Sequence, residues 1–125
     1  MPYTVEYDQE SECILVQVQG YFELSLLQQM VPEIAMCLKK NGCSRVLNDL
    51  RSAMLTDYVT DIYKIPESVR KAGVSREIKR ALLVTEITPE FRFLETSFIN
   101  RGNIVRLFTN IDKARKWLSE SSADL

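Results

Sequence analysis

Short apolar runs alternate with segments of helical periodicity along this chain, and that alternation limits the possible folds more than any other feature. Connecting successive strands through helices calls for right-handed crossovers and a mostly parallel sheet. The sequence therefore predicts an α/β fold with a five-stranded mixed sheet and four helices, in which only the first strand is antiparallel. The predicted strands cover residues 3–7, 13–18, 45–50, 80–85 and 104–108.

The first two strands are predicted to form a hairpin. Tyr3, Val5 and Tyr7 recur with the period of two that is typical of a half-buried strand. A polar turn separates this strand from the next, and antiparallel neighbours can be joined by such a short connection. Gly20 is expected to end the second strand.

Capping residues and prolines set the predicted limits of the helices. Ser25, Thr88 and Asn110 each precede a segment of helical periodicity and are expected to be N-caps. Pro32 lies inside the first helical pattern and Pro66 inside the second. Because proline lacks a backbone donor, we expect a kink or a late start at Pro32, and a kink or two short helices at Pro66.

Length and charge exclude several classes of protein. The 125 residues correspond to one domain, 1–125, and 46% of them are hydrophobic, which is enough for a core. Lys and Arg total 16 against 17 for Asp and Glu, so a general nucleic-acid binder is not expected. Short basic runs such as Lys79-Arg80 are interpreted as solvated faces.

The sequence also predicts where the protein is located. No apolar run approaches the ~18 residues that a membrane-spanning helix needs. The first residues carry no basic-then-apolar signal pattern. The sequence therefore predicts a cytoplasmic protein without a membrane span.

The inventory of reactive side chains favours a protein that is not an enzyme. The chain contains no histidine, which excludes histidine zinc sites and Ser-His-Asp triads. Cys13, Cys37 and Cys43 are an odd number of cysteines without metal-clip spacing, so we interpret them as reduced structural thiols. No metal and no cofactor are predicted.

The candidate site follows the third predicted strand. Residues 45–50 are expected to run into a polar turn and then into the start of the second helix. The carboxyl ends of parallel strands are common docking positions, and a helix N-terminus offers free N–H groups. A structural alternative is that these side chains only satisfy turn and cap N–H groups. The candidate binding residues are Asp49, Arg51, Ser52, Thr56, Asp57 and Tyr58.

Two catalytic hypotheses for the same segment are weaker. Asn48 and Asp49 could form an acid–base pair at the end of a buried strand. No second carboxyl group or histidine stands at a spacing that would complete a mechanism. Ser52 lacks both a base and the glycines of a nucleophile elbow.

The order of elements and two local motifs resemble the STAS domain, specifically the small stand-alone SpoIIAA-like proteins. The motifs are Asn48-Asp49-Leu50 after the third strand, and Phe108-Thr109-Asn110-Ile111 leading to Ala114 and Trp117-Leu118. The resemblance covers nearly the whole chain. It implies the fold of bacterial anti-sigma-factor antagonists and a regulatory role through protein contact.

The chain departs from the antagonists at their phosphorylation motif. In those proteins an Asp-Leu turn is followed by Asp-Ser-Ser-Gly at a helix start, where a kinase modifies a serine. Here Asp49 and Asp57 match the two aspartates, but Tyr58 and Val59 replace the serines and Thr60 replaces the glycine. The resemblance therefore does not carry the phosphorylation switch to this chain.

Two hypotheses of function follow from these observations. The first is a non-catalytic module that binds a protein partner at the third-strand turn and the second-helix start. The alternative is a carrier or sensor of a small apolar or lipid-like ligand, because related proteins are likened to the CRAL-TRIO lipid-binding fold. Phe91, Phe93 and Phe98 and the two proline-containing helices also favour this alternative. A homodimer is kept as a further option on base rates.

Overall fold

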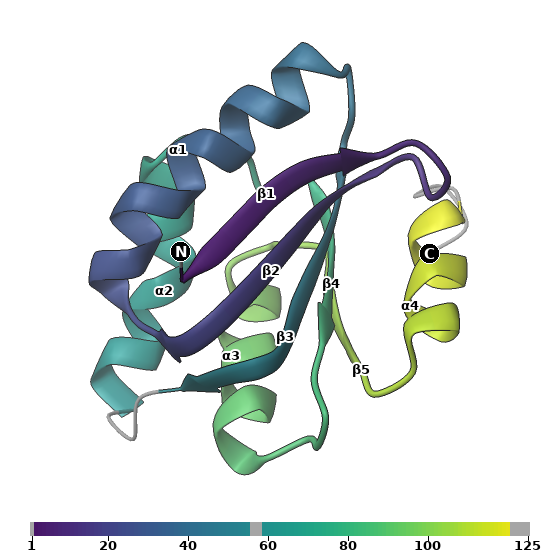
Figure 1. Cartoon of the computed structure of the whole chain (residues 1–125). Coiled ribbons are helices and arrows are strands. Elements are labelled where there is room, and N and C mark those ends of the chain that lie inside the picture. The colour runs from purple at the N-terminus through teal and green to yellow at the C-terminus, as the bar shows by residue number, and fades with distance from the viewer. Residues whose placement is uncertain (1, 56–58, 121–125) are drawn as a thin grey trace.

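The structure is a computed structural model that describes residues 2–55 and 59–120 (Figure 1). Within that part of the chain, five strands form one sheet in the order β1-β2-β3-β4-β5. β1 is antiparallel to β2, and all other neighbours are parallel, as the sequence predicted. The strands are β1 (Tyr3–Asp8), β2 (Cys13–Phe22), β3 (Arg45–Leu55), β4 (Lys79–Leu83) and β5 (Val105–Phe108), and the helices are α1 (Leu24–Lys40), α2 (Val59–Lys71), α3 (Pro89–Asn100) and α4 (Ile111–Ser119).

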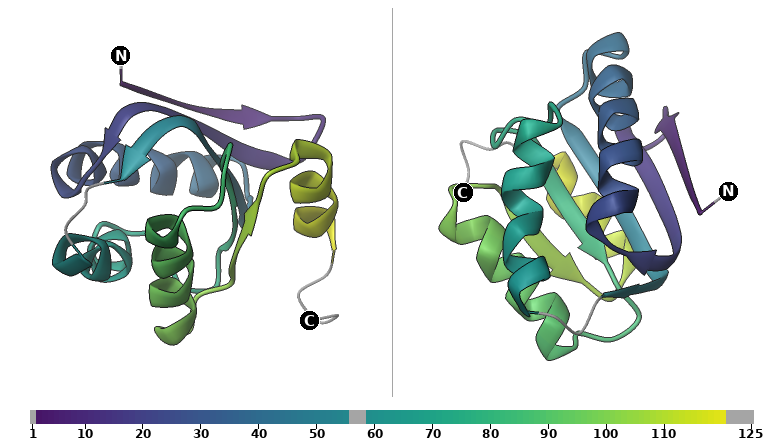
Figure 2. Two further views of the ribbon diagram at one scale, coloured as in Figure 1. Left: turned by 90° about the horizontal axis from the view of Figure 1, so that it is seen from below. Right: turned by 90° about the vertical axis from the view of Figure 1, so that its left-hand side faces the viewer.

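The helices cover the two faces of the sheet unequally. Figure 2 shows α1, α2 and α3 on one side and α4, among the described helices, by itself on the other. We call these sides the three-helix face and the α4 face. Successive side chains of β3 point to opposite faces of the sheet, so β3 contributes core residues to both faces. Val46 and Leu50 join the large core under three helices, whereas Leu47 packs with Trp117 under α4.

β2 and β3 are both longer than the sequence predicted. Gly20 does not end β2 but lies inside it at φ +83°, and the strand continues to the buried Phe22. β3 continues to Leu55, so the prediction of a polar turn after Leu50 is wrong. Asn48 and Asp49 stay in the strand because each has a partner there: Asn48 donates to the carbonyl of Ala81 at 3.4 Å, and Asp49 accepts from Arg51.

Two of the three predicted N-caps are confirmed. The Thr88 hydroxyl accepts from the N–H of Phe91, and the Asn110 side chain accepts from the N–H of Lys113. Ser25 is not a cap, because α1 begins one residue before it and its N-cap residue is Glu23. The Ser25 hydroxyl donates to the Glu23 carboxylate instead.

Neither proline starts its helix or divides it in two. Pro32 lies well inside α1 and does not mark its start, and Pro66 lies inside one continuous α2. Tertiary packing explains this, since buried side chains lie on both sides of each proline. Burial of an amphipathic face contributes more to helix stability than local propensity does. Ile65 and Val69 are examples around Pro66.

The aromatic side chains of α3 belong to the core. Phe91 and Phe98 are buried, and Phe93 packs partly against the same cluster. Ile99 is half exposed because it lies one step around the helix from Phe98. Their burial therefore gives no support to the hypothesis that these phenylalanines line a ligand-binding site on α3.

The buried thiol of Cys13 provides a test of the packing under α4. Cys13 is fully buried, and burial raises the pKa of its thiol to about 11. Because the thiolate is the reactive form, we expect Cys13 to resist iodoacetamide at pH 8 in the native protein, whereas Cys37 and Cys43 are accessible. Peptide mass spectrometry checks this, and labelling of Cys13 at the same rate as Cys43 would contradict the packing.

Candidate functional site

A β-bulge in β3 shapes the candidate site. Gln17 of β2 pairs with Asp49, but Gln19 pairs with Ser52, so Leu50 and Arg51 together oppose the single residue Val18. Leu50 points into the core on the three-helix face. The extra residue brings both Arg51 and Ser52 to the α4 face, beside Asp49.

Asp49 and Arg51 form a two-pronged ion pair. The Arg51 Nε lies 2.9 Å from Asp49 Oδ1, and Nη2 lies 2.8 Å from Oδ2. The Arg51 backbone N–H also donates to Oδ1, at 3.2 Å. The Asp49 side chain is only 11% exposed, whereas that of Arg51 is 46% exposed. The carboxylate therefore holds the guanidinium in one orientation on the surface of the sheet.

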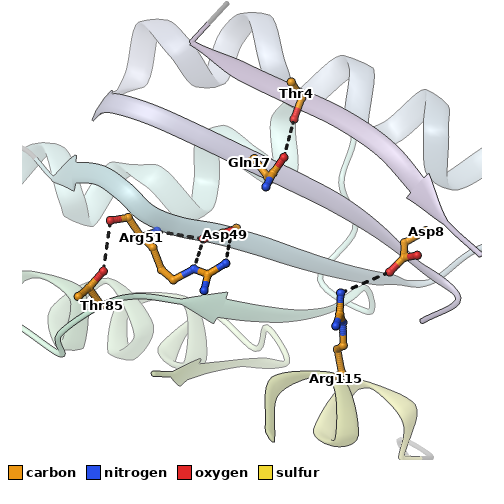
Figure 3. Close-up of polar contacts among 7 residues, drawn as sticks. All are labelled: Thr4, Asp8, Gln17, Asp49, Arg51, Thr85 and Arg115. Atoms are coloured by element: carbon orange, nitrogen blue, oxygen red, sulfur yellow. Dashed lines mark hydrogen bonds and ion pairs between the residues drawn. The ribbon is translucent and has the colours of Figure 1, made fainter. Parts of the chain in front are cut away.

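Further polar contacts lie on the strands on either side of this ion pair (Figure 3). The Thr4 hydroxyl of β1 donates to the Gln17 side-chain oxygen at 3.4 Å, and Gln17 is the strand partner of Asp49 across β2 and β3. On the other side, the Thr85 hydroxyl donates to the Arg51 carbonyl at 3.3 Å. A surface depression of about 330 Å³ lies here, lined by Tyr3, Thr4, Gln17, Val18, Gln19, Asp49, Arg51 and Ser52.

α4 leaves this part of the sheet uncovered. It packs against β3, β4 and β5 around Leu47, Ala81 and Leu83. Farther along β2 and β3, Tyr21 and Met54 pair across the strands and are 62% and 54% exposed. Their neighbours Phe22 and Leu55 face the core, so alternation places this pair on the α4 face. We call the uncovered area the open half-face; it comprises Thr4, Gln17, Gln19, Tyr21, Asp49, Arg51, Ser52 and Met54.

The structure brings half of the predicted site together. Asp49, Arg51 and Ser52 lie side by side on the open half-face, within a strand and not in a turn. The other predicted residues, Thr56, Asp57 and Tyr58, lie outside the described residues.

Sequence reasoning missed the part of the site that β2 contributes. Exposed and buried side chains alternate along β2. The exposed ones are Gln17, Gln19 and Tyr21, and the buried ones are Val16, Val18 and Phe22. That pattern predicts one exposed face along the whole strand. Stopping the strand at Gly20 concealed the pattern.

The geometry does not support acid–base chemistry here. Asn48 and Asp49 are consecutive strand residues on opposite faces of the sheet, so they cannot act on one substrate atom. The hydrogen bond from Arg51 is the main cause that lowers the pKa of Asp49, so this group is an ionised structural partner and a poor proton donor. The described residues contain no group of three Cys, Asp or Glu side chains placed to hold a metal ion. They also contain no helix with the length and apolarity to cross a bilayer.

Replacing Asp49 with asparagine tests the ion pair through its pH dependence. A carboxyl whose pKa is lowered by folding stabilises the protein above its unfolded pKa of about 3.9, and that stabilisation is lost as pH falls through the folded value. At pH 7 we expect Asp49→Asn to lower the free energy of unfolding by about 1–2 kcal/mol, because charged hydrogen bonds are lost. Urea denaturation at pH 7 and near pH 3 measures the difference, which should shrink in acid. A difference that stays constant would contradict the role of the charge.

Comparison with solved structures shows which known fold this architecture matches. The chain superposes on an uncharacterized protein of the DUF3478 family from Shewanella loihica PV-4, described as having a SpoIIAA-like fold, with a TM-score of 0.61 over 93% of this chain and 91% of the other. The chain has the SpoIIAA-like fold. The two sequences are 19% identical.

A second solved structure agrees with this assignment. The anti-sigma factor antagonist SpoIIAA in its unphosphorylated form superposes with a TM-score of 0.51 at 10% identity, covering 95% of this chain and 99% of that one. No protein-family model matches the chain, and no curated protein matches it significantly. The SpoIIAA-like fold predicted from Asn48-Asp49-Leu50 and the order of elements is thus confirmed by structure.

Proposed function

We propose that this protein is a non-catalytic regulatory module of the STAS type that binds a protein partner on the open half-face. The observation that carries the proposal is the uneven covering of the sheet. One half of the α4 face lies under a helix, and the other half presents Tyr21 and Met54 to solvent beside an oriented Arg51. Exposed apolar groups rimmed by polar side chains are typical of interaction sites.

The composition of the open half-face suits a protein surface. Tyrosine and arginine are the residue types most often found at the energetic centres of protein interfaces. Arg51 is already held by Asp49, so binding costs little of its side-chain entropy. Gln17, Gln19 and Ser52 offer donors and acceptors around it. A partner that places apolar side chains over Tyr21 and polar groups over the glutamines matches this pattern.

The likeness to the SpoIIAA structure supports a regulatory role but supplies no switch. That protein is described as an anti-sigma factor antagonist in an unphosphorylated form. In this chain Tyr58 and Val59 stand where the resemblance expects serines. We therefore propose that partner binding here depends on the surface of the sheet and involves no covalent step on this chain.

A matched pair of methionine variants tests the proposal. Met54 lies on the open half-face and Met36 lies on α1, and both are well exposed. Partners are captured with the wild-type protein from native lysate, identified, purified and measured by titration calorimetry. We expect Met54→Glu to weaken binding at least about tenfold, because it places a charge at the interface, and Met36→Glu to leave binding unchanged.

Arg51→Glu is the second variant and should lose binding as well, since it removes the oriented guanidinium. Circular dichroism checks that each variant is folded. Equal affinity of Met54→Glu, Arg51→Glu and the wild type for every purified partner would exclude the open half-face as the docking surface.

A further inference from the structure

The two edges of the sheet differ in how their outward backbone groups are satisfied. At β5, the N–H of Leu107 donates to the Glu95 carboxylate of α3 at 2.8 Å and not to another strand. At the other edge, Figure 2 (right) shows β1 at the margin of the sheet, with no described segment on its outer side. A free edge of this kind presents unpaired N–H and C=O groups that can pair with another strand.

The register with β2 identifies the free groups of β1. The Gln19 N–H donates to the Pro2 carbonyl at 2.7 Å, so these opposite residues form a hydrogen-bonded pair. Bonded and non-bonded pairs alternate along an antiparallel ladder, so the next pair, Tyr3 with Val18, is non-bonded. Every second residue of β1 therefore turns its N–H and C=O outward. These residues are Tyr3, Val5 and Tyr7. Their outward groups make no hydrogen bond within the described part of the chain.

The side chains along this edge are only partly covered. Val5 and Tyr7 pack against the large core on the three-helix face, yet both remain partly exposed. Thr4 and Glu6 point to the α4 face and are exposed. A strand that pairs with residues 3–7 would therefore cover apolar side chains on one face of the sheet. On the other face it would meet a single charge, that of Glu6.

The β1 strand of a second copy meets these requirements. When two β1 strands pair antiparallel about a two-fold axis at Val5, Val5 opposes its own copy and Tyr3 opposes Tyr7. All outward N–H and C=O groups of residues 3, 5 and 7 are then paired in both copies. In this register Thr4 opposes Glu6, so a hydroxyl faces the carboxylate. The next register in one direction would set Glu6 against Glu6, and like charges directly opposite are destabilising.

We propose that the protein forms a two-fold symmetric dimer in which the β1 strands of two copies pair antiparallel with Val5 at the axis. The two sheets then join into one, and this contact closes the assembly at two copies. The strands left at the ends of the joined sheet are the copies of β5, where Glu95 holds the Leu107 N–H. The axis is perpendicular to the sheet, so both open half-faces lie on the same side and stay uncovered. The dimer does not depend on the docking function.

A matched set of threonine variants tests the dimer and its register. Sedimentation equilibrium over a range of concentrations measures the dimer Kd. We expect Thr4→Glu to raise this Kd about tenfold, because two carboxylates oppose each other at both symmetric positions. Thr4→Lys should lower it, since an ammonium then faces Glu6. Thr109→Glu makes the same change at an exposed position after β5 and should leave the Kd unchanged. A wild type that stays monomeric up to about 1 mM would overturn the proposal, and so would equal Kd values for Thr4→Glu and Thr4→Lys.

Amide hydrogen exchange on the wild type checks the contact surface without any variant. The Val5 N–H has no partner in a single copy, so it should exchange rapidly in dilute protein and slowly above the dimer Kd. The Glu6 N–H is the internal control, because it bonds to Leu15 of β2 in the single copy and should be protected at both concentrations. A dimer in which the Val5 N–H still exchanges rapidly would form through another surface, and the proposal would be wrong.

Discussion

Replacing Trp117 with alanine is expected to lower the free energy of unfolding by about 3–5 kcal/mol, the usual cost of truncating a buried tryptophan. Trp117 is buried between α4 and the sheet, with its ring centre 5.6 Å from that of Phe108. The Lys79 ammonium lies 4.4 Å from the Trp117 ring and donates to the carbonyls of Trp117 and Glu120 near the end of α4. Loss of the ring thus removes an apolar contact and a cation–π contact together.

Urea denaturation at pH 7 measures this change. Lys116→Ala, an exposed substitution on the same helix, is the matched control and should cost less than about 0.5 kcal/mol. A cost below 1 kcal/mol for Trp117→Ala would mean that α4 contributes little to the core. The division of the α4 face into a covered and an open half would then be wrong.

Glu95→Ala is expected to lower the free energy of unfolding by about 2–3 kcal/mol and to promote self-association. Glu95 is buried on α3, and its Oε2 accepts from the backbone N–H of Leu107 at 2.8 Å. The even-numbered residues Ile104 and Phe108 bond to β4, so the Leu107 N–H points away from the sheet. Glu95 therefore occupies a donor on the outer edge of β5, where a free donor would invite pairing with another chain.

Glu95→Gln is the matched variant, because an amide oxygen can still accept from Leu107. We expect it to lose less stability than Glu95→Ala and to remain monodisperse. Denaturation curves and light scattering during size-exclusion chromatography measure both effects. If the two variants were equally destabilised and equally monodisperse, the contact to the Leu107 N–H would have no protective role at this edge.

The sequence could predict the order of elements but not the position of the candidate site within β3. Asn48 and Asp49 interrupt an apolar run, and polar residues in such a place usually indicate a turn. Their partners, the Ala81 carbonyl and the Arg51 guanidinium, keep them in the strand instead. The bulge that brings Arg51 and Ser52 to the same face depends on the register with β2, which no local pattern contains.

The burial of charged side chains was the second feature that the sequence patterns could not predict. Lys79 and Arg80 were interpreted as a solvated basic run, and that interpretation is wrong because both are buried. They are consecutive in a strand that is covered on both faces, so one lies under α4 and the other under three helices. Lys79 finds the carbonyls at the end of α4, and Arg80 lies against Phe98. Such partners come from distant segments and leave no periodic signal.

Site-specific crosslinking tests the central claim, that the open half-face is the docking surface, more directly than any variant. Tyr21 on the open half-face and Tyr63 on α2 are both exposed, so each can be replaced by the photoreactive analogue benzoylphenylalanine in otherwise identical proteins. We predict that light crosslinks a purified, identified partner to the protein labelled at position 21 and not to the protein labelled at position 63. Crosslinking at position 63 alone, or with equal yield at both positions, would contradict the claim.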